Sequence, residues 1–280
     1  MAVVEFDQIA GVYDETRRAL DEETSNGIAE MLSKHGCRSI LEIGVGTGRV
    51  AIPLLTGGYE IMGVDISRRM MEKARAKGMR NLFLAEGSKA PFRDNSVDAT
   101  LMAHVFHLLE KPMSVMREAA RISRVGVFAL VRKRRGLRGP WSWLYGRDNS
   151  SQSDNSIDET TKRLFDESRE RLSKIARKYG WSWESSQRFR NWRREQEILQ
   201  VYPPDDLKVV SDVVVSYNID ERIARLEKGG YSFMSRMPVA MRKEIVEEMR
   251  SRASSLPQWT SQPRHEVYQL ALWNSKTLLH

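Results

Sequence analysis

Short apolar runs alternate with amphipathic stretches through the first half of the chain. In the amphipathic stretch 21–35, apolar side chains recur three and four positions apart, as Ile28, Met31 and Leu32 do. Such spacing is typical of helices packed on a sheet, whereas short continuous apolar runs match buried strands. The five runs are 40–43, 60–65, 81–85, 99–103 and 126–131. Strands followed by helices in this order predict an α/β fold with a mainly parallel sheet.

The second half of the chain mixes helical and strand patterns. An apolar stripe at helical spacing predicts one long helix over 158–179. After the break at Pro203-Pro204, the valine-rich stretch 207–217 predicts a strand, and alternation over 267–273 predicts a closing strand. The two helices predicted between these strands are 219–228 and 238–254. The whole chain therefore carries seven predicted strands.

Composition narrows the class of protein. Hydrophobic residues make up 41% and charged residues 29% of the 280 positions, as in ordinary globular enzymes. No apolar run reaches the roughly 18 residues that span a bilayer, and the start lacks the pattern of a secretory signal. We therefore expect a cytoplasmic protein. Cys37 is the single cysteine, and the histidines form no ligand pair, so the sequence predicts neither a disulfide nor a metal site.

The first apolar run ends in a turn built from glycine. Gly44, Gly46 and Gly48 follow Glu42 at the end of the predicted strand, and a helix begins soon after. Glycine tolerates positive φ and lets a ligand approach the backbone, while free N–H groups at a helix start attract electron-rich groups. A dinucleotide fingerprint needs its third glycine at the position of Arg49. The G-x-G-x-G spacing therefore favours a different small cofactor.

With Glu42 two positions before the first glycine, this turn resembles the first motif of the class I S-adenosylmethionine-dependent methyltransferases, acidic-x-G-x-G-x-G. The resemblance covers roughly residues 5–132. It implies that S-adenosylmethionine is the cofactor and that Glu42, Gly44, Gly46 and Gly48 contribute to its site.

The second predicted strand ends in an acidic residue of the same pattern. The segment from Asp65 through Ile66 to Met70 resembles the family's D-x-S-x-x-M segment. In that family the acid holds the ribose hydroxyls and the methionine packs on adenine, so we assign all three residues to the cofactor site. Two alternatives stay open: Asp65 is also placed to cap a helix, and Met70 is also suited to fill the core.

Two further positions are assigned to the cofactor site on the resemblance. Glu86 and Gly87 lie at the position where related enzymes meet the adenine ring, although aspartate is usual there. Tyr13 belongs to a lead-in, F-D-x-x-A-x-x-Y-D, whose tyrosine closes over the cofactor in related small-molecule enzymes, including those of quinone biosynthesis. The alternatives are that Glu86 is a solvated loop carboxylate and that Tyr13 only packs the lead-in onto the sheet.

One histidine is a candidate for the chemistry. His104 leaves the fourth predicted strand beside the expected methyl position, and imidazole titrates near neutral pH. We assign it to the cofactor site and name it as the candidate general base. A histidine that lines the pocket without transferring a proton is the alternative, because methyl transfer needs mainly alignment.

One basic segment carries a net charge of +8, which equals the net charge of the whole chain. Between Arg121 and Arg147 there are eight basic side chains and no acidic one. This segment leaves the fifth predicted strand at its carboxyl end, where open α/β sheets bind ligands. Arg132, Arg134, Arg135 and Trp141 are therefore candidate substrate residues, suited to an anionic or planar molecule. A solvated arginine-rich turn explains the same residues equally well.

The resemblance implies an α/β, Rossmann-like methyltransferase sheet of seven strands, the last of them antiparallel, with a helical insertion that caps the substrate. We expect a cofactor-binding core over 1–132, a mostly helical cap over 133–205, and closing strands and helices over 206–280. The oligomeric state is not indicated.

The function expected from these features is methyl transfer to a small molecule, and the basic segment favours an anionic acceptor. RNA is the second candidate substrate, because aromatic side chains are interleaved with arginine after the fifth strand. A non-catalytic cofactor-binding module and, more weakly, a nicotinamide dehydrogenase are the alternatives from other classes.

Overall fold

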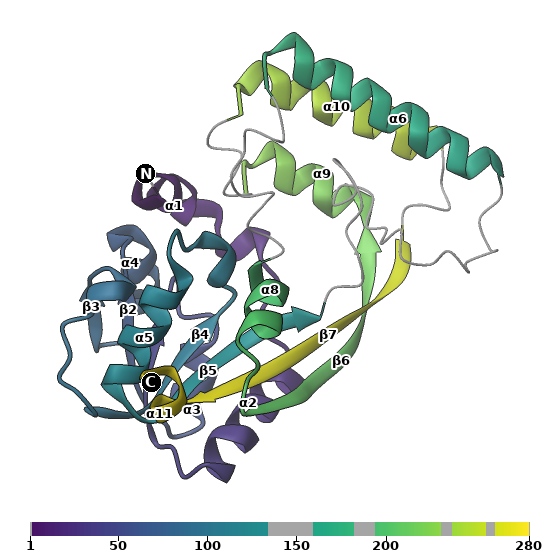
Figure 1. Ribbon diagram of the computed structural model, residues 1–280. Coiled ribbons are helices and arrows are strands. Elements are labelled where there is room, and N and C mark those ends of the chain that lie inside the picture. The colour runs from purple at the N-terminus through teal and green to yellow at the C-terminus, as the bar shows by residue number, and fades with distance from the viewer. Residues whose placement is uncertain (1, 134–158, 182–193, 231–236, 256–260, 280) are drawn as a thin grey trace. The chain divides into compact units, whose positions relative to one another are not determined.

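The computed structural model describes residues 2–133, 159–181, 194–230, 237–255 and 261–279. A single sheet of seven strands organises these residues, in the order β3-β2-β1-β4-β5-β7-β6 (Figure 1). The strands are β1 (Ser39–Ile43), β2 (Glu60–Asp65), β3 (Leu82–Leu84), β4 (Val97–Ala103), β5 (Ser123–Lys133), β6 (Asp206–Asn218) and β7 (Ser261–Asn274). All seven predicted strands are confirmed.

Helices connect the strands. The α-helices are α1 (Ala2–Ile9), α2 (Glu22–Lys34), α3 (Ala51–Thr56), α4 (Arg68–Ala76), α5 (Pro112–Ile122), α6 (Glu159–Lys178), α8 (Arg194–Val201), α9 (Ile219–Glu227), α10 (Val239–Ser255) and α11 (Ser275–Leu279). Short 3-10 helices are η1 (Ala10–Val12), η2 (Asp14–Thr16), η3 (Gly87–Lys89) and η4 (Phe106–Leu108). Local chemistry fixes several helix starts: the Asp21 carboxylate accepts the Thr24 N–H at 2.8 Å to cap α2, and Pro112 begins α5.

The strand directions match the predicted topology. Strands β3, β2, β1, β4 and β5 are parallel to their neighbours, and β7 runs antiparallel to β5 with Gly126 opposite Asn274. A Cβ at Gly126 would lie 2.3 Å from the Trp273 carbonyl oxygen, so only glycine lets the two strands approach here. The Rossmann-like sheet with its last strand antiparallel is thus confirmed.

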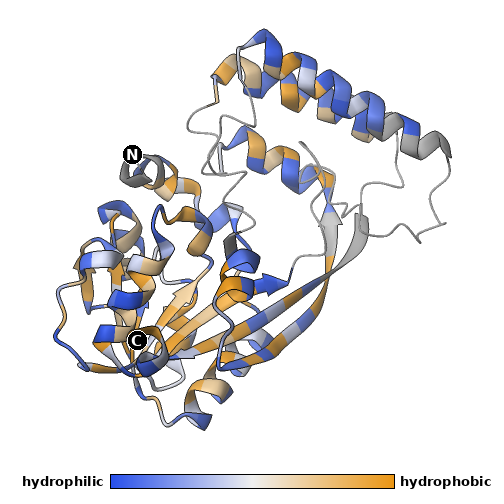
Figure 2. Ribbon diagram, in the orientation of Figure 1, coloured by the Kyte–Doolittle hydropathy of each residue, from blue (hydrophilic) through white to orange (hydrophobic). Residues whose placement is uncertain are grey.

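Two apolar layers lie on opposite faces of this sheet. Side chains of α2, α3 and α4, such as Ile28 and Leu54, form one layer, and side chains of α5, such as Met116, form the other. In Figure 2 the central strands are coloured mainly hydrophobic, whereas the helices carry both hydrophobic and hydrophilic residues. Because both faces are covered, the carboxyl ends of the strands are the natural place for a ligand.

The chain divides into two compact units. Unit 1 comprises Met1–Lys133, Arg190–Asp212 and Glu266–His280, and unit 2 comprises Arg134–Phe189 and Val213–His265. This division differs from the expected boundaries at 132 and 205. The difference has two causes. Helix α8 packs with β5 and η4. Helices α9 and α10, which the sequence analysis grouped with the closing strands, pack with each other, and α10 also packs with α6.

Unit 2 is stabilised by an amphipathic helix pair. On α6 and just beyond it, Lys178 and Tyr179 both contact the Glu244 carboxylate of α10, at 2.6 and 2.5 Å. Leu172 of α6 and Met249 of α10 are fully buried. In the described part of the chain, we find no helix of the length and hydrophobicity needed to cross a bilayer.

Candidate functional site

The glycine turn after β1 depends on backbone conformations that other residues rarely adopt. Gly44, Gly46 and Gly48 have φ of +78°, +55° and +79°. A Cβ at Gly44 would lie 2.5 Å from Cγ1 of Val105 and would also be strained. Gly44 is therefore required both by its backbone conformation and by its close packing against Val105, and the binding of a cofactor at this turn stays a prediction.

Asp65 ties this loop to the end of β2. Its two carboxylate oxygens accept the Gly46 N–H and the Ser67 N–H, each at 2.8 Å. Burial raises the pKa of Asp65, and these backbone donors act in the opposite direction. The Ile66 N–H also donates to this carboxylate, so about one of its four lone-pair sites is left for a ligand hydroxyl. Ser67, not Asp65, caps α4, because the Ser67 hydroxyl oxygen accepts the Met70 N–H at 3.2 Å.

The lead-in at the start of the chain packs over Met70. Met70 is 2% exposed and shares a small apolar cluster with Ile9 and Ala10, against which Tyr13 is partly buried. The Tyr13 ring also carries the Arg17 guanidinium 4.9 Å from its centroid. Tyr13 and Met70 thus lie together, and their contact with adenine remains a prediction. Ile66 lies half-buried between Asp65 and the α4 cap.

Two acidic side chains fasten the lead-in to the loops of the site. Asp7 accepts a hydrogen bond from the Ser67 hydroxyl at 2.6 Å, and Asp14 accepts one from the Thr47 hydroxyl at 2.6 Å. Lys77 contacts the other Asp14 oxygen at 2.6 Å and donates to the Thr47 carbonyl at 3.0 Å. The sequence analysis missed these residues as site residues, although both acids belong to the lead-in motif.

Glu42 is a buried carboxyl group with one free oxygen. Glu42 is 2% exposed. Its Oε2 atom has no hydrogen-bond partner among the described residues. Burial raises the pKa of Glu42 to about 8, although the Ala51 N–H donates to the carboxylate. An unpaired buried oxygen is costly, so it marks a position where a ligand group fits.

Glu86 and Gly87 follow β3 at the same edge of the sheet. The Glu86 side chain is exposed and accepts a hydrogen bond from the Ser88 hydroxyl at 2.8 Å. A Cβ at Gly87 would lie 2.6 Å from Cγ2 of Ile43, so this backbone sits tightly against β1. Glu86 is a loop carboxylate here, and its contact with an adenine amino group stays a prediction.

His104 leaves β4 in an unusual conformation. Its φ is +55°, in the left-handed region that is uncommon for a residue other than glycine. Its Nε2 atom is buried and has no hydrogen-bond partner among the described residues. Burial, reinforced by the charge of Arg49, lowers the pKa of His104 to about 3. The ring is therefore neutral at physiological pH and presents a hydrogen-bonding nitrogen.

Charged pairs surround His104. The Tyr268 ring meets it edge-on with centroids 5.6 Å apart, and the Tyr268 hydroxyl donates to Glu266 at 3.0 Å. Arg132 forms an ion pair with the same Glu266, so its charge is compensated. The other predicted substrate residues, Arg134, Arg135 and Trp141, lie outside the described residues.

A second pair near His104 comes from α8. His107 Nδ1 lies 3.4 Å from Glu195 Oε1, and Glu195 is 3% exposed. The charge of Glu195 raises the pKa of His104, against the larger effect of burial. The sequence analysis missed Glu195, because the link between η4 and α8 joins positions 88 residues apart.

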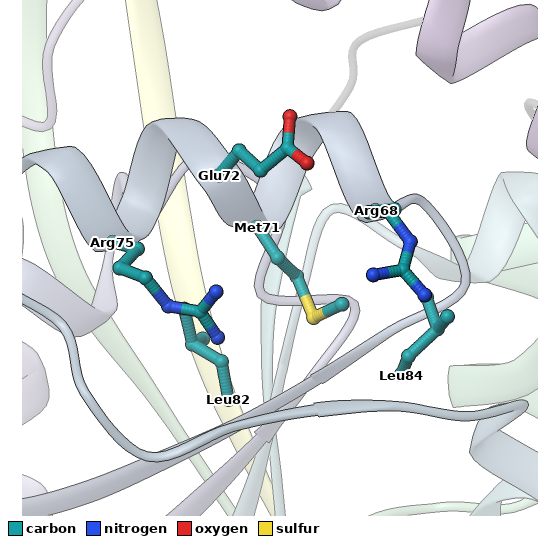
Figure 3. A pocket seen from close by; sticks show the side chains of 6 residues that line it. All are labelled: Arg68, Met71, Glu72, Arg75, Leu82 and Leu84. Atoms are coloured by element: carbon teal, nitrogen blue, oxygen red, sulfur yellow. The ribbon is translucent and has the colours of Figure 1, made fainter.

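The predicted residues thus gather at the carboxyl ends of the parallel strands. Glu42 lies near the end of β1 and the glycine turn follows that strand, Asp65 is the last residue of β2, and His104 follows β4. A shallow hollow elsewhere, between α4 and β3, contains none of the predicted site residues (Figure 3). No group of three or more possible metal ligands occurs among the residues that the structure describes.

Comparison with known proteins finds similarity over part of the chain. Residues 41–131 match the family model described as a methyltransferase domain. An uncharacterised methyltransferase of Mycobacterium tuberculosis is 30% identical over 122 residues, which are 43% of this chain and 48% of that protein. A demethylmenaquinone methyltransferase of Tropheryma whipplei is 29% identical over 128 residues, 43% of this chain and 54% of that protein. The matched region spans about half the length of these curated relatives.

A solved structure shares the fold over nearly the whole chain. A protein of Anabaena variabilis, described as a methyltransferase from an antibiotic biosynthesis pathway, aligns with a TM-score of 0.59 at 16% identity. The alignment covers 91% of this chain and 98% of that protein, and at this identity it shows the fold alone. Residues 41–131 match a methyltransferase domain, and over this part the chain is similar to curated methyltransferases.

Proposed function

We propose that this protein binds S-adenosylmethionine at the glycine turn and transfers its methyl group to a small organic molecule. The observation that carries the proposal is the buried, unpartnered Oε2 of Glu42 beside a turn whose three glycines have positive φ. The cofactor bears a cationic amino group, and a buried carboxyl group without a partner suits such a ligand. Asp65, which keeps acceptor capacity beyond its backbone donors, suits a ribose hydroxyl.

Bound S-adenosylmethionine supplies an activated methyl group that is open to in-line displacement. The protein has then mainly to align the acceptor and exclude water, which accounts for about 7–11 kcal/mol of barrier lowering in favourable cases. In our proposal, His104 Nε2 accepts a hydrogen bond from the acceptor and orients it. A neutral imidazole with a pKa of about 3 is a weak base, so alignment is the larger contribution of His104.

The acceptor that we propose is a small molecule rather than a nucleic acid. Two relatives are named as quinone-biosynthesis methyltransferases, which is consistent with a small aromatic acceptor. The expectation of an anionic acceptor loses the support of Arg132, because Glu266 compensates its charge. Tyr268 and His104 offer instead an aromatic surface and one hydrogen-bonding nitrogen.

Calorimetric titration tests the first half of the proposal. We expect heat of binding with S-adenosylmethionine and with S-adenosylhomocysteine, and none with NAD at equal concentration. Mass spectrometry of a panel of phenols, quinols and amines incubated with the cofactor tests the second half. Absence of binding by both adenosyl compounds would remove the proposed function.

The same experiments separate the two other readings of the sequence. Methylation of RNA with an affinity that falls steeply with salt would favour a nucleic-acid substrate, because phosphate contacts release counterions. Tight cofactor binding with no methylated product from either panel would favour a non-catalytic cofactor-binding module.

A further inference from the structure

We propose that the hollow between α4 and β3 is a docking site for an extended, acidic segment of a partner protein, which joins the sheet as a further strand beside β3. The hollow contains none of the residues assigned to the cofactor, so the proposal does not depend on the proposed function. All the residues that line it belong to unit 1.

The hollow has an apolar floor. Met71 of α4 and Leu82 and Leu84 of β3 contribute to it, and its volume is about 230 Å³ (Figure 3). Met71 is 6% exposed, whereas Leu84 is 50% exposed. The floor therefore runs from the core of unit 1 out to a leucine on the surface. Covering it with an apolar side chain would remove apolar surface from water.

A guanidinium group lies at each end of this floor. Figure 3 shows Arg68 beside Leu84 and Arg75 beside Leu82. Both arginine side chains are exposed, and neither forms a hydrogen bond or ion pair with another described residue. Glu72, the acidic residue between them on α4, points its carboxylate away from both guanidinium groups (Figure 3). The two arginines are thus available to carboxylates at the two ends of an apolar ligand.

The backbone of β3 favours a peptide as that ligand. β3 is the last strand at its end of the described sheet. The Asn81 carbonyl and the Ala85 N–H both bond to the β2 backbone, at 2.9 and 3.1 Å. Because backbone groups alternate in direction along a strand, Leu82 and Leu84 turn theirs toward the open edge. An extended peptide binds such an edge through main-chain hydrogen bonds.

The two arginines set the pattern of the segment that fits. Arg68 and Arg75 are seven positions apart, which is about 10 Å along a helix. Side chains four positions apart on one face of a strand are about 13 Å apart, and two flexible arginine side chains span the difference. The matching pattern is acidic-x-apolar-x-acidic, with the apolar side chain on the floor.

The surrounding charge also favours an acidic peptide. α4 carries four basic side chains and one acidic side chain, so it attracts a negatively charged partner. A single-stranded nucleic acid is the other polyanion of interest, but its bases bind by stacking on aromatic rings. None of the six described residues that line the hollow is aromatic.

Binding of a short synthetic peptide to the full chain tests the proposal. Fluorescence anisotropy should give a Kd below about 1 mM for labelled Glu-Thr-Leu-Thr-Glu, and no binding for the same peptide with lysine in place of glutamate. The double variant Arg68→Gln, Arg75→Gln should bind the acidic peptide at least about fivefold more weakly. Arg117→Gln, at an exposed position of α5 on the other face of the sheet, is the matched control and should bind it as wild type does.

Methylation of the peptide backbone separates strand pairing from simple charge attraction. Only alternate N–H groups of an added strand face β3, so N-methylation of the leucine blocks an antiparallel strand and N-methylation of a threonine blocks a parallel one. We expect one of these two peptides to lose at least about tenfold in affinity and the other to bind as the unmodified peptide does.

Several outcomes would overturn the proposal. These are no binding of the acidic peptide by wild type, equal binding by the double variant, and undiminished binding of both methylated peptides. Tighter binding of oligouridine than of the peptide, lost in the double variant, would assign the hollow to nucleic acid instead. Thermal melting checks that the double variant is folded, and the lysine and methylated peptides test the proposal on the wild-type protein alone.

Discussion

Glu42 shows how a single buried side chain links stability to ligand binding. Its pKa is raised by burial to about 8, above the usual 4.5, so the folded chain holds a proton that the unfolded chain releases. Stability is then greatest below about pH 4.5, as far as Glu42 is concerned, and declines as the pH rises toward 8. A binding role for the carboxyl group accounts for this cost.

Replacing Glu42 by glutamine should therefore stabilise the protein at alkaline pH. We expect Glu42→Gln to raise the free energy of unfolding at pH 8 by about 1–3 kcal/mol, with little change near pH 4.5. Urea denaturation at both pH values measures this difference. A variant less stable than wild type at pH 8 would show that the carboxyl group is satisfied in the folded protein.

His104 combines a strained backbone with an unpartnered nitrogen, and asparagine separates the two features. Asparagine tolerates the left-handed conformation, so His104→Asn should fold normally while losing the buried ring nitrogen. We expect turnover to fall at least about tenfold, with the affinity for S-adenosylhomocysteine within about threefold of wild type. His35→Asn, between the end of α2 and the start of β1, is the control. Unchanged turnover would take His104 out of the reaction.

At the scale of elements, Asp98 joins the starts of three strands at the edge of the sheet opposite the site. One of its oxygens accepts the Arg38 and Ser39 N–H groups at 2.9 and 2.8 Å, and the other accepts from Arg124 of β5 at 2.6 Å. Partial burial opposes ionisation, but these donors hold the pKa of Asp98 well below its usual range.

Loss of this charge should weaken the sheet. We expect Asp98→Asn to lower the free energy of unfolding at pH 7 by about 1.5–3 kcal/mol, because hydrogen bonds to a charged group are lost. The depressed pKa means that the contribution of Asp98 is present above pH 4 and declines as the pH falls through its folded value. The gap between wild type and variant in thermal melts should accordingly narrow in strong acid, and a gap that widens there would contradict the assignment.

The lead-in is held by a few polar contacts rather than by a large apolar surface. Asp7 and Asp14 bond Ser67 and Thr47, and the ion pair to Lys77 is well exposed and so contributes little. The double variant Asp7→Asn, Asp14→Asn should raise hydrogen exchange over residues 6–16 and leave the global melting temperature within a few degrees of wild type. Equal exchange in both proteins would mean that the apolar cluster around Met70 suffices.

Over the whole molecule, the periodicity of the sequence predicted the positions of helices and strands. It did not predict which distant elements pack together. The predicted helices at 158–179 and 219–228 are α6 and α9 to within a residue at each end, because one apolar stripe records which side is buried. An apolar stripe does not indicate which element packs against it. The sequence therefore could not predict that α8 belongs to unit 1. The motif positions were assigned from local patterns, whereas the pairing of Arg132 with Glu266 joins positions 134 residues apart.

The division into two units makes a last prediction about the whole chain. All the residues proposed to bind the cofactor belong to unit 1, while α6, α9 and α10 belong to unit 2. Saturation with S-adenosylhomocysteine should therefore slow hydrogen exchange over residues 42–51, 65–70 and 104–107, and leave α6 and α10 unchanged, because a ligand protects the segments that it holds closed. Mass spectrometry of peptic fragments resolves these segments. Protection centred on α6 and α10, with the glycine turn unaffected, would move the cofactor site to unit 2 and contradict the assignment of the turn.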